Sequence, residues 1–265
     1  LATSRDDVYF LYDSNERDNL IEGYSKELSK SILIEKGLVK PLLKGEDVHR
    51  YQKIETDRVV IFPYKKIGND AVLYTEEELH EEFPLGYAYL KECEEILRGR
   101  EKGRFNIDGE WFQFGRKQGI AFAEFEKLIA PEISKGGNFA YDKKGEFYST
   151  TTIYGYIKKK ETKESYKSLL AILNSQLLWW YLVNTGTVLA NGYFRYKPNY
   201  LNPFPMPRYI SNETQLELEI LTDEMTVAIN NNEVIAIENI KKRIDELIYS
   251  LYNLTSKDIS TISEF

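Results

Sequence analysis

The stretch RVVIFPYKKIGNDAVLYTEEELHEEFPLGYAYLKECEEILRG (Arg58–Gly99) contains both kinds of regular structure in succession. It begins with an apolar, β-branched run, residues 58–62, that Pro63 ends, and this pattern predicts a strand. Thr75, followed by three glutamates, is typical of a helix start, and apolar residues then recur every three or four positions up to Gly99. Because a strand and a long helix share one short segment, the stretch indicates an α+β fold.

Outside this stretch, strand-like runs lie at residues 7–11, 31–34, 127–133, 139–141 and 153–157. Asp142–Gly145 predicts a hairpin turn between Tyr141 and Phe147, because glycine tolerates the positive φ that such turns need. Residues 164–184 predict one long, largely buried helix, and two further helical patterns follow from Glu213. We therefore expect a mixed-sheet domain over residues 1–208 and a helical C-terminal segment over residues 209–265.

Composition narrows the class of protein. A chain of 265 residues with 42% hydrophobic residues can bury the core of one large domain or two smaller ones. The single Cys93 excludes an internal disulfide framework, and His49 and His80 are too few for a Cys/His zinc cluster. No apolar run is long enough to cross a bilayer, and the start, LATSRDDVYF, is no signal peptide. We expect a cytoplasmic chain that is a piece of a longer protein.

Charge is unevenly distributed along the chain. Residues 1–97 carry a formal net charge of −8, residues 98–208 carry +8 and residues 209–265 carry −7. Because affinity for a phosphate backbone depends on local cation density, a basic block inside an acidic protein can bind nucleic acid. An ordinary solvated surface with uneven charge is the alternative interpretation.

Within the basic block, cations, hydroxyls and aromatic residues gather in the segments 98–119, 141–152 and 185–197. Arginine, glutamine and asparagine read base edges through hydrogen bonds, so the base-reading candidates are Arg116, Gln118, Asn191 and Arg195. Lysines, hydroxyls and backbone amides suit the sugar–phosphate backbone. The backbone candidates are Arg98, Arg100, Lys102, Arg104, Lys117, Lys143, Lys144, Ser149, Thr150, Thr151, Tyr193, Tyr196 and Lys197. Some of them, Arg116 especially, would equally serve in internal ion pairs that orient loops.

Motifs for catalysis are mostly missing, since the chain has no glycine-rich dinucleotide or P-loop turn and no G-x-S-x-G elbow. Glu132, Asp142 and Lys144 do fit a loose acid, spacer, acid-x-Lys pattern, in which two carboxylates hold Mg²⁺ and the lysine positions a water. A Mg²⁺-dependent endonuclease is therefore one alternative to DNA binding. A protein-interaction module, in which the acidic helices over residues 213–251 dock a partner, is another.

Several short motifs then follow one another in a recognisable order: PLLKGEDVHRY (Pro41–Tyr51), VVIFPY, YLKECEEILRGR, WFQFGRKQG, KLIAPEIS with the later FAYD, LLAILNSQLLWWY, LNPFPMP and the ending IDELIYSLYNLTSKDI. With these motifs the chain resembles the TaqI-like C-terminal specificity domain. This is the target-recognition domain of adenine-N6 DNA methyltransferases and of bacterial type IIG restriction-modification enzymes. The resemblance covers nearly the whole chain, from about Asp7 to Ile259.

The resemblance implies that this chain binds a short sequence of double-stranded DNA, does no catalysis by itself and holds no cofactor. It also implies a parent protein whose N-terminal methyltransferase domain binds S-adenosylmethionine and is the second partner of this chain. Where a nuclease domain is present in the parent, the resemblance implies that it lies further upstream and uses Mg²⁺. Because recognition loops differ between members, the resemblance assigns no individual base contact.

Overall fold

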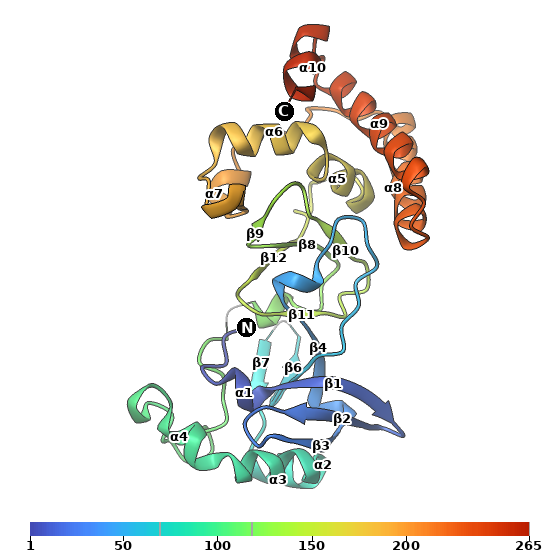
Figure 1. Ribbon diagram of the computed structural model, residues 1–265. Helices are drawn as coiled ribbons and strands as arrows, with labels where there is room; N and C mark the ends of the chain where they lie inside the picture. Colours follow the sequence, from blue (N-terminus) through green and yellow to red (C-terminus); the bar gives the residue numbers. More distant parts are fainter. Residues whose placement is uncertain (69, 118, 265) are drawn as a thin grey trace. The chain divides into compact units, whose positions relative to one another are not determined.

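The computed structural model describes residues 1–68, 70–117 and 119–264, and the chain divides into two compact units. Unit 1 consists of Leu1–Leu43, Glu55–Phe125 and Lys144–Thr151, and unit 2 consists of Lys44–Ile54, Glu126–Lys143 and Thr152–Phe265. Both units contain helices and strands (Figure 1), which confirms the predicted α+β class. The sequence analysis divided the chain differently, into a domain over residues 1–208 and a helical segment over residues 209–265. That division stays a prediction.

Unit 1 is built on a six-stranded mixed sheet with the strand order β11-β4-β5-β1-β2-β3. Its strands are β1 (Phe10–Arg17), β2 (Leu20–Ser25), β3 (Lys30–Glu35), β4 (Val39–Leu43), β5 (Val59–Ile61) and β11 (Tyr148–Ser149). Neighbours pair antiparallel except β11, which runs parallel to β4. Strands β6 (Tyr64–Ile67) and β7 (Asp70–Leu73) form a separate hairpin. The core of this unit includes the buried aromatic residues Trp111, Phe112 and Phe114.

The helices of unit 1 differ from the expectation of one helix up to Gly99. They are α1 (Asp6–Tyr9), α2 (Glu76–Glu82), α3 (Pro84–Glu92) and α4 (Glu94–Gly103), with short 3₁₀ turns η1 (Lys36–Leu38) and η3 (Ile120–Phe122). Thr75 does cap α2, since its hydroxyl accepts from the Glu78 amide at 3.2 Å. The helix breaks at Phe83, because Pro84 disfavours helical φ/ψ in the residue before it. The predicted strand at 7–11 is partly wrong, because α1 occupies Asp6–Tyr9 and the strand starts at Phe10.

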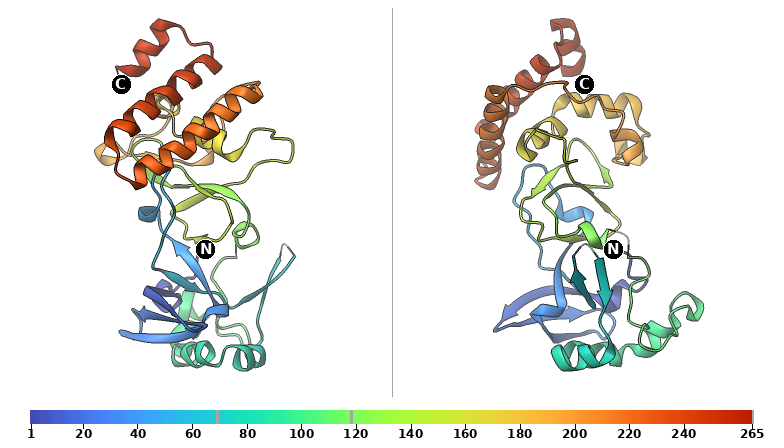
Figure 2. Two further views of the ribbon diagram at one scale, coloured as in Figure 1. Left: turned by 90° about the vertical axis from the view of Figure 1, so that its right-hand side faces the viewer. Right: turned by 180° about the vertical axis from the view of Figure 1, so that it is seen from behind.

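Unit 2 combines a small sheet with most of the helices. Strands β8 (Lys127–Pro131), β10 (Ala140–Asp142) and β12 (Ile153–Tyr156) form an antiparallel sheet in the order β10-β8-β12, and β9 (Ile133–Ser134) pairs with β13 (Phe194–Arg195). The helical elements are η2 (Gly45–Asp47), α5 (Tyr166–Leu173), α6 (Gln176–Thr185), η4 (Ala190–Gly192), α7 (Pro198–Leu201), α8 (Asn212–Asn230), α9 (Val234–Leu251) and α10 (Ser256–Ser263). Helices α8 and α9 lie side by side (Figure 2), which confirms the two helical patterns expected after Glu213.

The hairpin predicted at Asp142–Gly145 is wrong. Gly145 does have a positive φ of 67°. However, β10 before it pairs with β8, whereas β11 after it pairs with β4, a strand more than a hundred residues earlier in the chain. A turn signal fixes local backbone conformation but does not select the strand that follows as the partner. Within the part of the chain that the structure describes, no helix is long and apolar enough to cross a membrane.

A polar junction interrupts the helix expected over residues 164–184. Asn174 ends α5, and its side-chain amide accepts from the Phe139 amide at 2.8 Å and donates to the Phe139 carbonyl at 2.9 Å. Arg50 donates to the Asn174 carbonyl at 2.6 Å. The carboxylate of Asp245, on α9, accepts from the Gln176 amide at the start of α6 at 2.9 Å. Segments far apart in the sequence are therefore joined at the α5–α6 break.

We expect the substitution Asn174→Asp to lower the free energy of unfolding by about 2–4 kcal/mol, because a carboxylate oxygen would face the buried Phe139 carbonyl instead of a donor. Asn184→Asp is the control, since the Asn184 side chain is exposed and donates to the Trp180 carbonyl at 2.7 Å. Urea denaturation of both variants, followed by circular dichroism, measures the difference. Equal losses in the two variants would contradict the role assigned to the junction.

Stability should also depend on pH through Asp245. Burial raises the pKa of this carboxyl, although the Gln176 amide and the charges of Lys241 and Arg50 act in the opposite direction. Because the folded pKa is raised, the neutral carboxyl contributes stability that is present below the unfolded pKa, about 3.9, and is lost as the pH rises through the folded pKa. In Asp245→Asn, the side-chain oxygen still accepts from the Gln176 amide, but the side chain does not ionise and loses no stability as the pH rises. The difference in melting temperature, variant minus wild type, should therefore increase between pH 4 and pH 7. A difference that does not change with pH would refute this role of Asp245.

Candidate nucleic-acid interface

Arg100 is a predicted phosphate contact, but in unit 1 its guanidinium lies in the interior. Its N–H groups donate to the carbonyls of Leu97 at 2.8 Å, Thr3 at 2.6 Å, Trp111 at 2.7 Å and Gln113 at 2.9 Å. Burial lowers the pKa of Arg100 from its usual value. Four of five donors are used inside the protein, so the placement argues against a phosphate contact. No feature of the sequence separates Arg100 from the neighbouring arginines.

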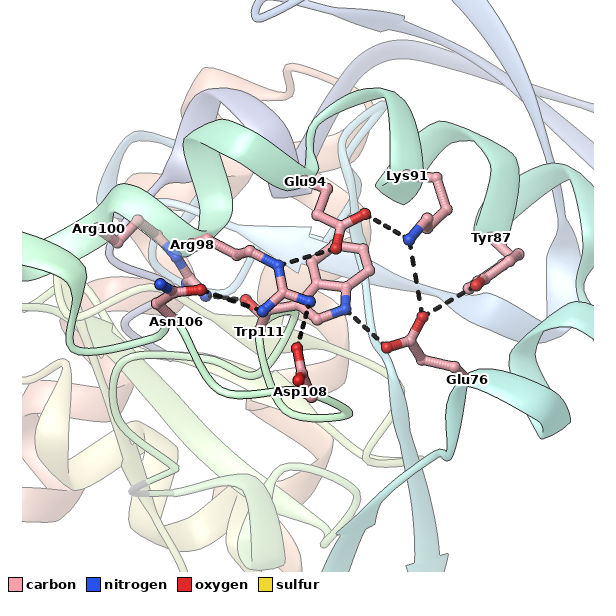
Figure 3. Close-up of polar contacts among 9 residues, drawn as sticks. All are labelled: Glu76, Tyr87, Lys91, Glu94, Arg98, Arg100, Asn106, Asp108 and Trp111. Atoms are coloured by element: carbon pink, nitrogen blue, oxygen red, sulfur yellow. Dashed lines mark hydrogen bonds and ion pairs between the residues drawn. The ribbon is translucent and has the colours of Figure 1, made fainter.

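Arg98 lies on the surface of unit 1 within a network of polar side chains on and beside α2–α4 (Figure 3). It donates to Glu94 at 2.8 Å and forms an ion pair with Asp108 at 3.0 Å, and its guanidinium lies 5.7 Å from the centre of the Trp111 ring. Lys91 bonds the same Glu94, and this bond is the main cause of the lowered pKa of the Glu94 carboxyl. The positive charge of Arg98 is therefore largely neutralised by its own protein.

The same network fixes the position of Trp111. Its indole N–H donates to Glu76 at 2.9 Å, and the Tyr87 hydroxyl donates to the other oxygen of that carboxylate at 2.9 Å (Figure 3). Arg104, at the end of this segment, is exposed and pairs with Glu101 at 2.7 Å. The segment around 98–104 is thus an ion-paired structural element more than an open cationic surface.

Two of the three predicted segments meet in unit 1. Arg116, Thr150 and Thr151 line one hollow of about 480 Å³, together with the acidic residues Asp6, Asp7 and Glu101. Arg116 is exposed, and its backbone amide donates to the Ala2 carbonyl at 3.0 Å, which holds the segment beside the N-terminal residues. Thr150 is buried and Thr151 exposed. The hollow therefore offers a guanidinium and a hydroxyl, both of which can bond to phosphate or base acceptors.

The remaining candidates of unit 1 lie at the surface. Lys102 and Lys117 are exposed, and the Lys117 ammonium lies 5.3 Å from the centre of the Tyr64 ring. Ser149 is half-buried in β11, and Lys144 pairs with Glu146 at 3.5 Å. Gln118 lies outside the described residues.

The carboxylates of the metal pattern are not brought together in unit 2. Asp142 is buried and forms an ion pair with Lys127 at 2.6 Å, at the start of β8. Glu132 comes just after the other end of β8, so the two residues are separated by roughly 16 Å along an extended chain. Among residues 1–68, 70–117 and 119–264, no group of three His, Cys, Asp or Glu side chains could hold a metal ion. The geometry therefore gives no support to the Mg²⁺ endonuclease.

The segment 185–197 of unit 2 has one buried and several exposed candidates. Tyr196 is fully buried, with its hydroxyl bonded to the Gly136 carbonyl, so a phosphate contact for it is unfavourable. Tyr193 is 42% exposed, Asn191 is exposed with a φ of 61°, and Lys197 is half-buried. Lys143, also in unit 2, is exposed.

Arg195 has an unusual environment in the same segment. Its Nη1 lies 3.9 Å from the Glu132 carboxylate, too far for a hydrogen bond, and its buried Nε has no partner among the described residues. The side chain is 40% exposed. This guanidinium therefore combines an accessible surface with N–H groups that the protein leaves largely unbonded. Sequence patterns identified Arg195, but they missed Glu132 as its neighbour, because the two are far apart in the sequence.

The model of the TaqI-like C-terminal specificity domain matches residues 40–206, and the chain belongs to this family. Proteins similar to this chain include methyltransferases and restriction enzymes of restriction-modification systems.

Two curated relatives are similar over most of this chain. The type II methyltransferase M.BanIII of Aneurinibacillus aneurinilyticus is 25% identical over 205 residues, which are 72% of this chain and 34% of the relative. The type II restriction enzyme and methyltransferase RM.Eco57I of Escherichia coli is 25% identical over 186 residues, 66% of this chain and 19% of the relative. This chain therefore spans about a third and a fifth of these proteins.

The fold also matches a solved structure of the type IIL restriction-modification enzyme MmeI in complex with DNA, with a TM-score of 0.54 and 14% sequence identity. The match covers 97% of this chain and 36% of the MmeI chain. At this identity the likeness concerns the fold.

We expect Arg100→Met to lower the free energy of unfolding by about 3–5 kcal/mol, because it removes the four hydrogen bonds that the guanidinium donates to carbonyls in the interior. Arg104→Met should cost less than about 1 kcal/mol, because it removes an exposed ion pair with Glu101 and a surface contact with the Phe105 ring. Denaturant unfolding and duplex binding are measured on the same preparations. A stable Arg100→Met protein with weakened DNA binding would instead place Arg100 at the interface.

Proposed function

We propose that this chain is the target-recognition domain of a type II, IIG-like restriction-modification enzyme and that it binds double-stranded DNA sequence-specifically. The observation that carries the proposal is membership of a specificity-domain family over residues 40–206. Its support in the structure is a set of accessible cations, Arg116 and Lys117 in unit 1 and Arg195 and Lys197 in unit 2. Arg98 and Arg104 contribute less, because acidic neighbours neutralise them.

In the parent protein, a methyltransferase domain would bind S-adenosylmethionine and methylate adenine, and a nuclease domain, where present, would use Mg²⁺. The two curated relatives support this, since one is a methyltransferase and the other both a restriction enzyme and a methyltransferase. The role of this chain is to hold the duplex so that the catalytic domain can extrude the target base, which requires a firm grip on the flanking backbone. Such a parent would act in the bacterial cytoplasm, where it meets the DNA.

Neither alternative is favoured. The separation of Glu132 from Asp142 argues against the hypothesis of a Mg²⁺-dependent endonuclease. The family match gives no support to the hypothesis of a module that binds only protein. The acidic helices α8 and α9 remain available for contacts with the parent's other domain.

Binding should be strongly salt-dependent. If four phosphates are neutralised, affinity for a random-sequence duplex should fall by about a hundred-fold between 50 and 200 mM salt. Fluorescence anisotropy at several salt concentrations gives the slope of log affinity against log salt. Lys117→Ala and Lys197→Ala should each make this slope shallower by about one, whereas the control Lys257→Ala, on α10, should leave it unchanged. A flat titration of the wild type would refute DNA binding.

A further inference from the structure

Strands β9 and β13 form a short two-stranded ribbon that the rest of unit 2 holds in place. Ser134 pairs with Phe194 and Ile133 with Arg195. The ribbon continues beyond these pairs, because the Tyr196 amide donates to the Glu132 carbonyl at 2.8 Å. Phe194 is buried, and its ring packs edge-on against Trp179 with the ring centres 5.3 Å apart. One face of the ribbon is thereby anchored in the core.

The opposite face of the ribbon carries the accessible side chains. Residues two apart on a strand point to the same side, so Tyr193 and Arg195 share the face opposite to Phe194. Ile133 is the direct cross-strand partner of Arg195 and joins the same face. Tyr193 is 42% and Ile133 43% exposed. The major groove of B-form DNA is wide enough to admit a two-stranded antiparallel ribbon, whose accessible face would then meet the base edges.

The charged residues at the ribbon can bond both the phosphate backbone and the base edges of a duplex. Lys135 follows β9 and Lys197 follows β13, so in this antiparallel pair the two lysines leave from opposite ends. Neither forms an ion pair within the described part of the chain. Between them lies the guanidinium of Arg195, with its unbonded Nε and with Glu132 at 3.9 Å. Nε itself is buried, so the accessible part of the guanidinium, on a side chain that is 40% exposed, is what a ligand with two adjacent acceptors can bond.

We propose that the β9–β13 ribbon enters the major groove and that Arg195 and Glu132 together read one G·C base pair. Arg195 donates to O6 and N7 of the guanine, and Glu132 accepts from the N4 amino group of the paired cytosine. Lys135 and Lys197 contact phosphates on the two sides of the groove. The proposal rests on the proposed function, that is, on the binding of double-stranded DNA by this chain.

The competing explanation is that Arg195 and Glu132 form an internal pair that only orients the loop 185–197. Both explanations predict some loss of affinity when Arg195 is removed. They differ in sequence preference, because a loop-orienting pair affects all base positions, whereas a base-reading arginine affects one.

The experiment selects preferred duplexes from a random library with this chain and with its variants Arg195→Ala, Arg195→Lys and Glu132→Gln. The control is Arg208→Ala, which removes an exposed arginine outside the ribbon. We expect Arg195→Ala to lose about ten-fold or more of the preference for G·C at a single position and to keep the preferences elsewhere. Glu132→Gln should weaken the same position, and Arg208→Ala should change none.

A second readout is interference by methylation at guanine N7. In the selected duplex, N7 methylation of one guanine should block binding by the wild type and have little effect on Arg195→Ala, whereas a loop-orienting role predicts no such difference. Thermal melting shows that each variant is folded. Unchanged preferences in Arg195→Ala, a loss spread over all positions, or no enriched sequence with the wild type would overturn the inference. Absence of any duplex binding by the wild type would instead remove the proposed function itself.

Discussion

Buried backbone groups need hydrogen-bond partners, and in this protein a few polar side chains supply them where helices and strands do not. Arg100 in unit 1 bonds carbonyls of three segments, including Thr3 near the start of the chain and Trp111 within the aromatic core. Asn174 has the corresponding role in unit 2, where its side-chain amide hydrogen-bonds both the backbone N–H and the carbonyl of Phe139, beside β10. The irregular segments beside these residues depend on those bonds.

This constraint changes the meaning of the basic block. Its net charge of +8 includes arginines that the protein uses for itself, such as the buried Arg100 and the ion-paired Arg98. The cations left for a polyanion are fewer and lie on particular loops, among them Arg116 and Arg195. The proposed DNA-binding surface would gain specificity in this way, because a small number of accessible donors reads bases better than a uniform cationic field.

Sequence patterns were successful where the signal is local. The helices α8 and α9, the strands β8 and β12 and the cap at Thr75 were all predicted, because periodicity and capping chemistry act over a few residues. The break between α5 and α6 was missed, although Ser175 is a good N-cap residue and its hydroxyl accepts from the Leu178 amide at 3.2 Å. Long apolar periodicity across Asn174 obscured that signal.

By itself, the sequence determined the α+β class, the order of the family motifs, the long helices α8 and α9 and several strands, among them β5, β8 and β12, because each of these is encoded in neighbouring residues. Only the tertiary structure decided which strands pair and which charged residues are accessible. Strand β11 has its partner in β4, Arg100 finds an acceptor in Thr3, and Glu132 lies beside Arg195. In each case the partners are far apart in the sequence, and their contact follows from packing that no local pattern records.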